Sequence, residues 1–115
     1  GYPTANLKVQ DEEKILPANG IYAVSAAIVA PDQQHLPAHT MQGMMSVGFR
    51  PTVDGKKRVI EVNLFNFNEN IYDQHLLVFV EKYLREEIKF NSLPELIAQI
   101  DQDKRDTLDF FQQKA

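Results

Sequence analysis

Residues 41–67, MQGMMSVGFRPTVDGKKRVIEVNLFNF, decide the fold, because they predict two β-strands joined by a tight turn. Asp54-Gly55 lies in the middle of this stretch and is among the strongest short signals for a β-hairpin. The residues after the turn alternate between an aliphatic set and a mixed set: Ile60, Val62 and Leu64 against Glu61, Asn63 and Phe65. Successive strand residues point to opposite faces of a sheet, so this strand should have one core face and one polar and aromatic face.

Strand signals continue on both sides of the hairpin. Before it, the turn Pro17-Ala18-Asn19-Gly20 leads into the apolar stretch Ile21 to Val29, whose short length and flanking turns favour a buried strand. After it, HLLVFVEKYL at residues 75–84 predicts a further apolar strand. The first three-quarters of the chain therefore predicts consecutive β-strands separated by turns.

The last quarter of the chain changes to a helical period. Ser92-Leu93-Pro94-Glu95 matches a capping box with a proline in the first turn. The residues that then recur at helical spacing are Leu93, Leu96, Ile97, Ile100, Thr107, Leu108 and Phe111. We expect one C-terminal helix across the sheet, and Asp101 to Lys104 are the place where it could break. At this size, closure of the antiparallel sheet into a small barrel would remove its exposed edges.

Composition excludes several classes of protein and site. With 115 residues the chain can form one domain around a single core, and its 43% hydrophobic and 24% charged residues are ordinary for a globular protein. It has no cysteine, which excludes disulfides, zinc–thiolate sites and cysteine nucleophiles. The formal net charge of -4 argues against a nucleic-acid partner, and no apolar run is long enough for a membrane-spanning helix. Neither a Ser-His-Asp signature nor a P-loop is present.

Two features could carry chemistry, and each also has a plainer interpretation. Glu61 lies inside a well-patterned strand, on a face that would suit either a pocket wall or solvent. In GYPTANL at residues 1–7, Pro3 stiffens the chain, and Thr4 and Asn6 share one face of an extended segment. Their oxygen atoms would suit a hard cation or a phosphate, or simply a polar turn that leads into a strand.

Six separated segments resemble one family, the riboflavin kinase domain at the C-terminus of bacterial bifunctional riboflavin kinase/FMN adenylyltransferases. They are GYPTANL, LPANGIYAV, VGFRPTVDG, IEVNLFNF, IYDQHLLVFVEKYLREEIKF and SLPELIAQIDQD, in the family's order and over nearly the whole chain. The resemblance implies a six-stranded antiparallel split β-barrel with a C-terminal α-helix. It also implies Mg²⁺-dependent transfer of the ATP γ-phosphoryl group to the ribityl 5′-hydroxyl of riboflavin, giving FMN and ADP.

The same resemblance implies roles for individual residues. Glu61 matches the family's catalytic carboxylate, and Thr4 and Asn6 match the pair associated with the magnesium ion and the nucleotide phosphates. Gly1, Pro3 and Ser46 are expected to contact the nucleotide. Arg85 and Asn63 are expected to contact the flavin substrate. The chain departs from the family pattern at two of these positions, with Ser46 where Asn is frequent and Asn63 where His is common.

Residues 1–115 are expected to form a single riboflavin kinase domain, as a fragment of a longer cytoplasmic protein. The family's glycine-bearing segment before GYPTANL and its N-terminal FMN adenylyltransferase domain are absent from the sequence. The expected partners are riboflavin or FMN, ATP or ADP, and that adenylyltransferase domain, with no nucleic acid and no membrane. A barrel that binds flavin without turnover, as a sensor or carrier, and a purely structural module are the alternatives; Thr4, Asn6 and Glu61 together favour the enzyme.

Overall fold

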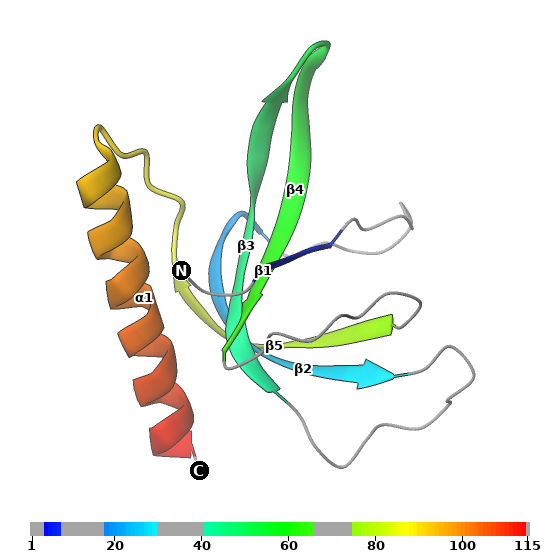
Figure 1. Cartoon of the computed structure of the whole chain (residues 1–115), viewed down its shortest axis with the longest axis vertical. Helices are drawn as coiled ribbons and strands as arrows, with labels where there is room; N and C mark the ends of the chain where they lie inside the picture. Colours follow the sequence, from blue (N-terminus) through cyan, green and yellow to red (C-terminus); the bar gives the residue numbers. More distant parts are fainter. Residues whose placement is uncertain (1–3, 8–17, 30–40, 66–74, 115) are drawn as a thin grey trace.

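The protein forms a twisted antiparallel sheet with one long helix beside it (Figure 1), in a computed structural model that describes residues 4–7, 18–29, 41–65 and 75–114. Five strands and the helix follow each other along the chain: β1 (Thr4–Leu7), β2 (Gly20–Val29), β3 (Met41–Thr52), β4 (Gly55–Leu64), β5 (His75–Arg85) and α1 (Leu93–Lys114). The strand order in the sheet is β1-β4-β3-β2-β5. Mainly β-structure with a C-terminal helix, as predicted from the sequence, is confirmed.

The β3–β4 hairpin forms where the sequence predicts it. Thr52 pairs with Gly55 at the tip, and Gly55 has a φ of 142°, a conformation that side-chain-bearing residues rarely adopt. The predicted alternation along β4 is also confirmed, because Ile60, Val62 and Leu64 are buried and belong to the main core. The hairpin therefore separates a core face of the sheet from a second face that carries Glu61 and Asn63.

The core lies on one face of the three central strands. Directly opposite residues in an antiparallel pair share a face, and Tyr22, Met45 and Val62 are aligned in this way across β2, β3 and β4. All three side chains are at most 5% exposed. The predicted strand before the hairpin is thus confirmed as β2, which packs in the middle of the sheet.

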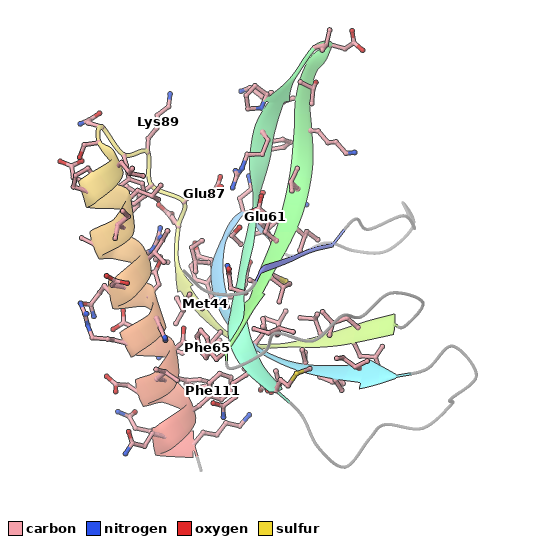
Figure 2. The ribbon with its side chains drawn as sticks, viewed as in Figure 1. Met44, Glu61, Phe65, Glu87, Lys89 and Phe111 are labelled. Carbon is pink, nitrogen blue, oxygen red and sulfur yellow. The ribbon has the colours of Figure 1, made fainter. Side chains whose placement is uncertain are left out.

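Helix α1 covers the second face of the sheet, and its C-terminal half makes the closer contact. Thr107 and Phe111 are buried there, together with Phe65 at the end of β4 (Figure 2). The Lys104 ammonium lies 5.7 Å from the centre of the Phe65 ring, and the Lys114 ammonium pairs with Glu81 of β5 at 2.7 Å. These contacts attach the end of the helix to both the middle and the edge of the sheet.

The start of α1 has the predicted cap, with one difference in its bonding. The backbone N–H of Glu95 donates to the Ser92 hydroxyl at 3.3 Å, as a capping box requires. The Glu95 carboxylate, however, accepts from the backbone N–H of Asn91 at 3.3 Å, one residue before the cap. The Glu95 N–H is one of the donors that the first turn leaves without helical partners, and the Asn91 N–H belongs to the segment just before the helix.

The suggested break between Asp101 and Lys104 is wrong, because α1 is continuous from Leu93 to Lys114. The physical reason is that Asp103 faces inward and binds the Arg85 side chain, so this polar residue supports the helix. The first half of the helical pattern also differs from expectation. Leu93 is 66% and Ile97 50% exposed, because this half of the helix stands across a cleft from the sheet.

Closure into a six-stranded barrel stays a prediction. Within the described residues β1 and β5 are the two edges of a five-stranded open sheet. The segments 8–17, 30–40 and 66–74, where a further strand would have to lie, are outside the described residues. No helix among the described residues is both long enough and apolar enough to cross a membrane.

Candidate active site

A cleft of about 870 Å³ lies between the second face of the sheet and α1, within the range typical of small-molecule sites. We call its first side the sheet wall, which consists of Ile21, Met44, Met45, Ser46, Arg50, Glu61 and Asn63. We call its second side the helix wall, which consists of Glu87, Ile88, Phe90, Leu96, Ile97, Ile100, Asp101 and Asp103. Arg85, at the end of β5, lines the cleft where the two walls meet.

Glu61 stands in the sheet wall with strand neighbours on both sides. It pairs with Ser46 of β3 and with position 6 of β1, and Asn63 pairs with position 4 of β1. Because directly opposite residues share a face, the register puts positions 4 and 6 on the same side of the sheet as Glu61 and Asn63. Two segments far apart in the sequence, residues 4–7 and the mid-chain strand β4, thus come together in the fold.

The segment after β5 is attached to β3 by an acidic side chain. Arg50 Nη1 lies 3.3 Å from the Glu87 carboxylate, which rests on the backbone of β3 at Gly48. A Cβ atom at Gly48 would overlap the Glu87 carboxylate, so a side chain there would displace that carboxylate. Gly48 and Arg50 are therefore the β3 residues that the Glu87 side chain contacts, between the sheet wall and the helix wall.

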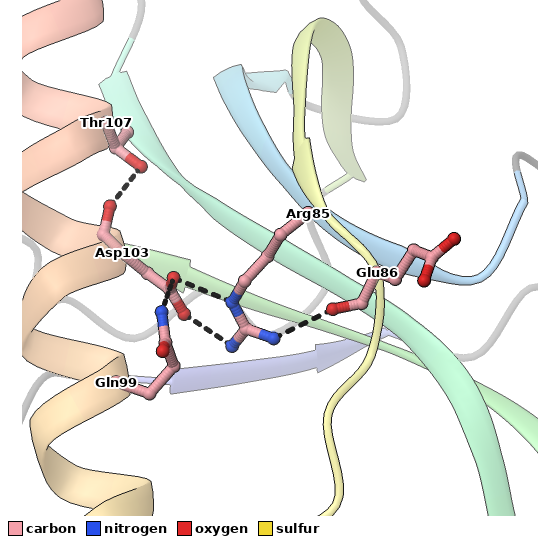
Figure 3. A network of polar contacts seen from close by, with 5 residues as sticks. All are labelled: Arg85, Glu86, Gln99, Asp103 and Thr107. Atoms are coloured by element: carbon pink, nitrogen blue, oxygen red, sulfur yellow. Dashed lines mark hydrogen bonds and ion pairs between the residues drawn. The ribbon is translucent and has the colours of Figure 1, made fainter.

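A second ion pair joins β5 to the helix wall (Figure 3). Arg85 donates from Nε to Asp103 Oδ1 at 2.8 Å and from Nη2 to Asp103 Oδ2 at 2.6 Å, while its Nη1 donates to the backbone carbonyl of Glu86 at 2.9 Å. Gln99 Nε2 also donates to Asp103 Oδ1 at 3.0 Å. The Thr107 hydroxyl donates to the backbone carbonyl of Asp103 at 2.7 Å, one turn further along. Arg85 and Asp103 of this network line the cleft.

The carboxylates of the cleft differ in what they bind. Glu87 pairs with Arg50 and Asp103 with Arg85, whereas no cation of the described residues pairs with Glu61. Glu61 is half-buried and lines the cleft with Met44, and Figure 2 shows Glu61 on the sheet with Met44 lower in the view. A carboxylate that no ion pair occupies, on a hydrogen-bonded strand, is suited to accept a proton from a bound hydroxyl group.

The helix wall opposite Glu61 is mostly apolar. Its apolar members are Ile88, Phe90, Leu96, Ile97 and Ile100. We call the part of the cleft between these residues and Met44, which is 5% exposed, the apolar slot, because apolar side chains line it from both walls. The cleft thus combines an apolar slot with a half-buried carboxylate, Glu61, on the sheet wall.

The cleft contains four of the residues that the sequence singled out: Ser46, Glu61, Asn63 and Arg85. Thr4 and Asn6 belong to β1, which pairs with the strand of Glu61. Gly1 and Pro3 lie outside the described residues. Among the described residues, no group of three or more histidine or acidic side chains could hold a metal ion.

Sequence reasoning did not identify Arg50, Glu87 or Asp103. For Asp103 a signal existed, because it falls on the same helical stripe as Ile100, Thr107 and Phe111. An acidic residue on a stripe that should be buried indicates a partner on the facing element. Arg50 and Glu87 give no such signal, since their pairing depends on how the segment after β5 docks on β3.

Comparisons with known proteins agree with one another over nearly the whole chain. A family model described as Flavokinase, riboflavin kinase, matches residues 1–111. The bifunctional riboflavin kinase/FMN adenylyltransferase of Bacillus subtilis is 34% identical over 114 residues, which cover 96% of this chain and 33% of the relative. The protein of the same description from Escherichia coli is 35% identical over 111 residues, again covering 96% of this chain and 33% of the relative.

A solved structure from Streptococcus pneumoniae, described as a macrolide-efflux protein, has a similar fold. It is 35% identical to this chain with a TM-score of 0.74, and the match covers 92% of this chain and 32% of that one. The chain therefore spans about a third of the length of the curated relatives that it matches.

Proposed function

The chain belongs to the riboflavin kinase family, and from this membership we propose that it transfers the γ-phosphoryl group of ATP to the ribityl 5′-hydroxyl of riboflavin. The products are FMN and ADP. The observation that carries the proposal is the position of Glu61, a carboxylate without an ion-pair partner among the described residues, in a cleft with an apolar facing wall.

Glu61 is the proposed general base. The attacking alcohol must lose its proton as the bond to phosphorus forms, and a carboxylate within hydrogen-bond reach can accept that proton. Pairing with neighbours on both sides holds the backbone of Glu61 in place. Phosphoryl transfer depends mainly on positioning and on neutralisation of charge, so a rigid strand is a suitable support for this residue.

The nucleotide is proposed to lie at the β1 edge of the cleft. Thr4 and Asn6 would supply hard oxygen ligands for Mg²⁺, with further ligands from the ATP phosphates and water, a set that Mg²⁺ prefers. The ion would neutralise charge on the phosphates, and Gly1, Pro3 and Ser46 would contact the nucleotide.

The flavin ring is proposed to occupy the slot between Met44 and the helix wall. Ring atoms would pack against Ile97 and Ile100, which removes apolar surface from water. Asn63 and Arg85 lie at the edges of the same slot and could donate hydrogen bonds to polar atoms of the substrate. The ribityl chain would then extend along the sheet wall toward Glu61.

We further propose that the chain works as one domain of a larger cytoplasmic protein that also contains an FMN adenylyltransferase domain. The names of the curated relatives and the third of their length that this chain spans support this arrangement. The macrolide-efflux description of the Streptococcus pneumoniae structure is not extended to this chain, because the family model and the curated relatives agree on riboflavin kinase.

The proposal is tested by an HPLC assay for FMN with riboflavin, ATP and Mg²⁺, on the chain alone and with any residues encoded before Gly1 restored. We expect FMN and ADP in equal amounts, and no FMN when Mg²⁺ is removed with a chelator. Riboflavin binding without any FMN from either protein would instead support the flavin-binding barrel that acts as a sensor or carrier. Absence of both binding and turnover would support the structural module.

A further inference from the structure

Asp103 is an acidic residue in an unusual position. It is 4% exposed in the middle of α1, and its carboxylate accepts hydrogen bonds from Arg85 Nε, Arg85 Nη2 and Gln99 Nε2 (Figure 3). Aspartate is almost never buried unless it is paired, so this position needs an explanation beyond solvent contact. Both Asp103 and Arg85 line the cleft, which relates the pair to the site.

Stability is a weak explanation for this ion pair. Two apolar side chains of similar volume often stabilise a protein as well as a buried ion pair does, because the charges lose their hydration. A bidentate pair does, however, constrain geometry, because the planar guanidinium and the carboxylate fit together in one relative orientation. The pair therefore fixes how α1 is oriented with respect to the end of β5.

That orientation matters because the apolar side chains in the first half of α1 are less buried than those in the second half. Leu93, Leu96 and Ile97 are 66%, 36% and 50% exposed, while Thr107 and Phe111 in the second half are buried. Asp103 lies one turn after Ile100, the last apolar member of the helix wall. A change in the angle of the helix at Asp103 would move Ile97 and Ile100 relative to the sheet wall.

We propose that Asp103 is a positioning residue for riboflavin, which acts through Arg85. By holding the Arg85 guanidinium, it sets the distance and angle between the helix wall and the sheet wall, and so the affinity of the slot for the flavin ring. Asp103 does not contact the reacting atoms, so the phosphoryl-transfer step at Glu61 does not depend on it. This inference rests on the proposed function, because it assumes that riboflavin binds in the slot.

The test is the Kd of riboflavin, measured by fluorescence quenching with MgADP present, for the wild type and Asp103→Asn. The variant keeps the side-chain volume, but its amide group turns donors toward the donors of Arg85. We expect the Kd to rise about tenfold, in line with the loss of a charged hydrogen-bond pair, and the KM for ATP and the kcat to stay within about twofold. Asp106→Asn is the matched control, because Asp106 is exposed on the same helix and binds only Gln102 among the described residues.

Two further variants separate this role from simple stabilisation. If Asp103 acts through Arg85, the effects of Asp103→Asn and Arg85→Lys on the Kd will not add in the double variant. If Asp103→Asn does not fold, Asp103→Glu keeps the charge, and its extra methylene group should move the helix wall and still raise the Kd. A purely structural role would instead lower the fraction of protein that binds riboflavin and leave the Kd unchanged.

The outcomes distinguish this inference from the proposed function. A wild type that binds no riboflavin overturns both. A wild type that binds riboflavin, with an unchanged Kd in folded Asp103→Asn or Asp103→Glu, overturns only the positioning role. Additive effects in the double variant, or an equal loss of affinity for ATP, also contradict it.

Discussion

The two walls of the cleft are built in different ways. The sheet wall comes from three neighbouring strands, and residues such as Val47 and Val62 on the other face of these strands are fully buried. The helix wall comes from one helix and the segment before it, with ion pairs at Arg50–Glu87 and Arg85–Asp103 and exposed apolar residues between them. We infer that the sheet wall gives Glu61 the precision that chemistry needs, while the helix wall supplies adjustable apolar surface for binding.

The first prediction places the chemistry on the sheet wall. Glu61→Gln keeps the shape of the side chain but removes the proton acceptor, so we expect the rate of FMN formation to fall by about a hundredfold or more. The Kd for riboflavin should change by less than about twofold, since the slot is intact. Glu86→Gln is the matched control, because Glu86 is exposed. Equal rates of FMN formation in Glu61→Gln and the wild type would contradict the proposed role of Glu61 as the general base.

The second prediction compares the stability behind each wall. Leu64 is 1% exposed in the core behind the sheet wall, so Leu64→Ala should lower the free energy of unfolding by about 2–5 kcal/mol. Leu93 is 66% exposed at the start of α1, so Leu93→Ala should change it by less than about 0.5 kcal/mol. Urea denaturation followed by circular dichroism measures both values. Similar losses in the two variants would show that the walls are equally important for folding.

The third prediction concerns binding by the helix wall. Ile97 is half exposed and lines the cleft, so Ile97→Ala should raise the Kd for riboflavin about fivefold through lost apolar contact. The kcat at saturating riboflavin should stay close to that of the wild type. Leu108→Ala serves as the control, since Leu108 is 40% exposed on the same helix and is not part of the cleft lining. A fall in kcat with an unchanged Kd would mean that Ile97 contributes to the chemical step and not to the binding of riboflavin.

The smallest expected effect concerns the C-terminal attachment of α1. The hydrogen bond from Lys114, with a second one from Ser25, lowers the pKa of Glu81 below its usual value of 4.5. A carboxyl group whose pKa is lower in the folded state stabilises the protein above the unfolded pKa, and this contribution is lost as the pH falls through the folded pKa. For such a partly exposed pair we expect about 0.5 kcal/mol.

Thermal unfolding of the wild type and Glu81→Gln at several pH values measures this contribution. The Tm of the wild type should be slightly higher at pH 7, and the two values should converge as the pH falls below 4.5, the usual pKa of the carboxyl group. A Tm difference that persists unchanged at low pH would mean that the charge of Glu81 does not hold the helix.

Local patterns predicted much of the fold. The strand β4 and its turn follow from the alternation around Glu61 and from Asp54-Gly55, which depend only on neighbouring residues. The suggested break in α1 failed because the partner of Asp103 is Arg85 on β5, and this pairing cannot be seen from helical spacing. Barrel closure stays a prediction, since it depends on segments outside the described residues.

The sequence also indicated several residues that the structure places in or beside the cleft, whereas their roles stay predictions. The composition of one strand face pointed to Glu61, and the extended segment at the start of the sequence pointed to Thr4 and Asn6, whose strand does pair with that of Glu61. Nothing in the sequence predicts that Gly48 leaves room for the Glu87 carboxylate, because that contact exists only after the segment beyond β5 docks on β3. The residues that line the sheet wall were therefore easier to predict than the contacts that hold the helix wall.

A crystal structure of the protein with riboflavin and MgADP most directly tests whether the sheet wall carries the chemistry and the helix wall binds the flavin ring. We predict that the flavin ring lies between Met44 and Ile97, with the ribityl 5′-hydroxyl within about 3.2 Å of the Glu61 carboxylate. Riboflavin bound outside this cleft, or with its 5′-hydroxyl directed away from Glu61, would contradict the account.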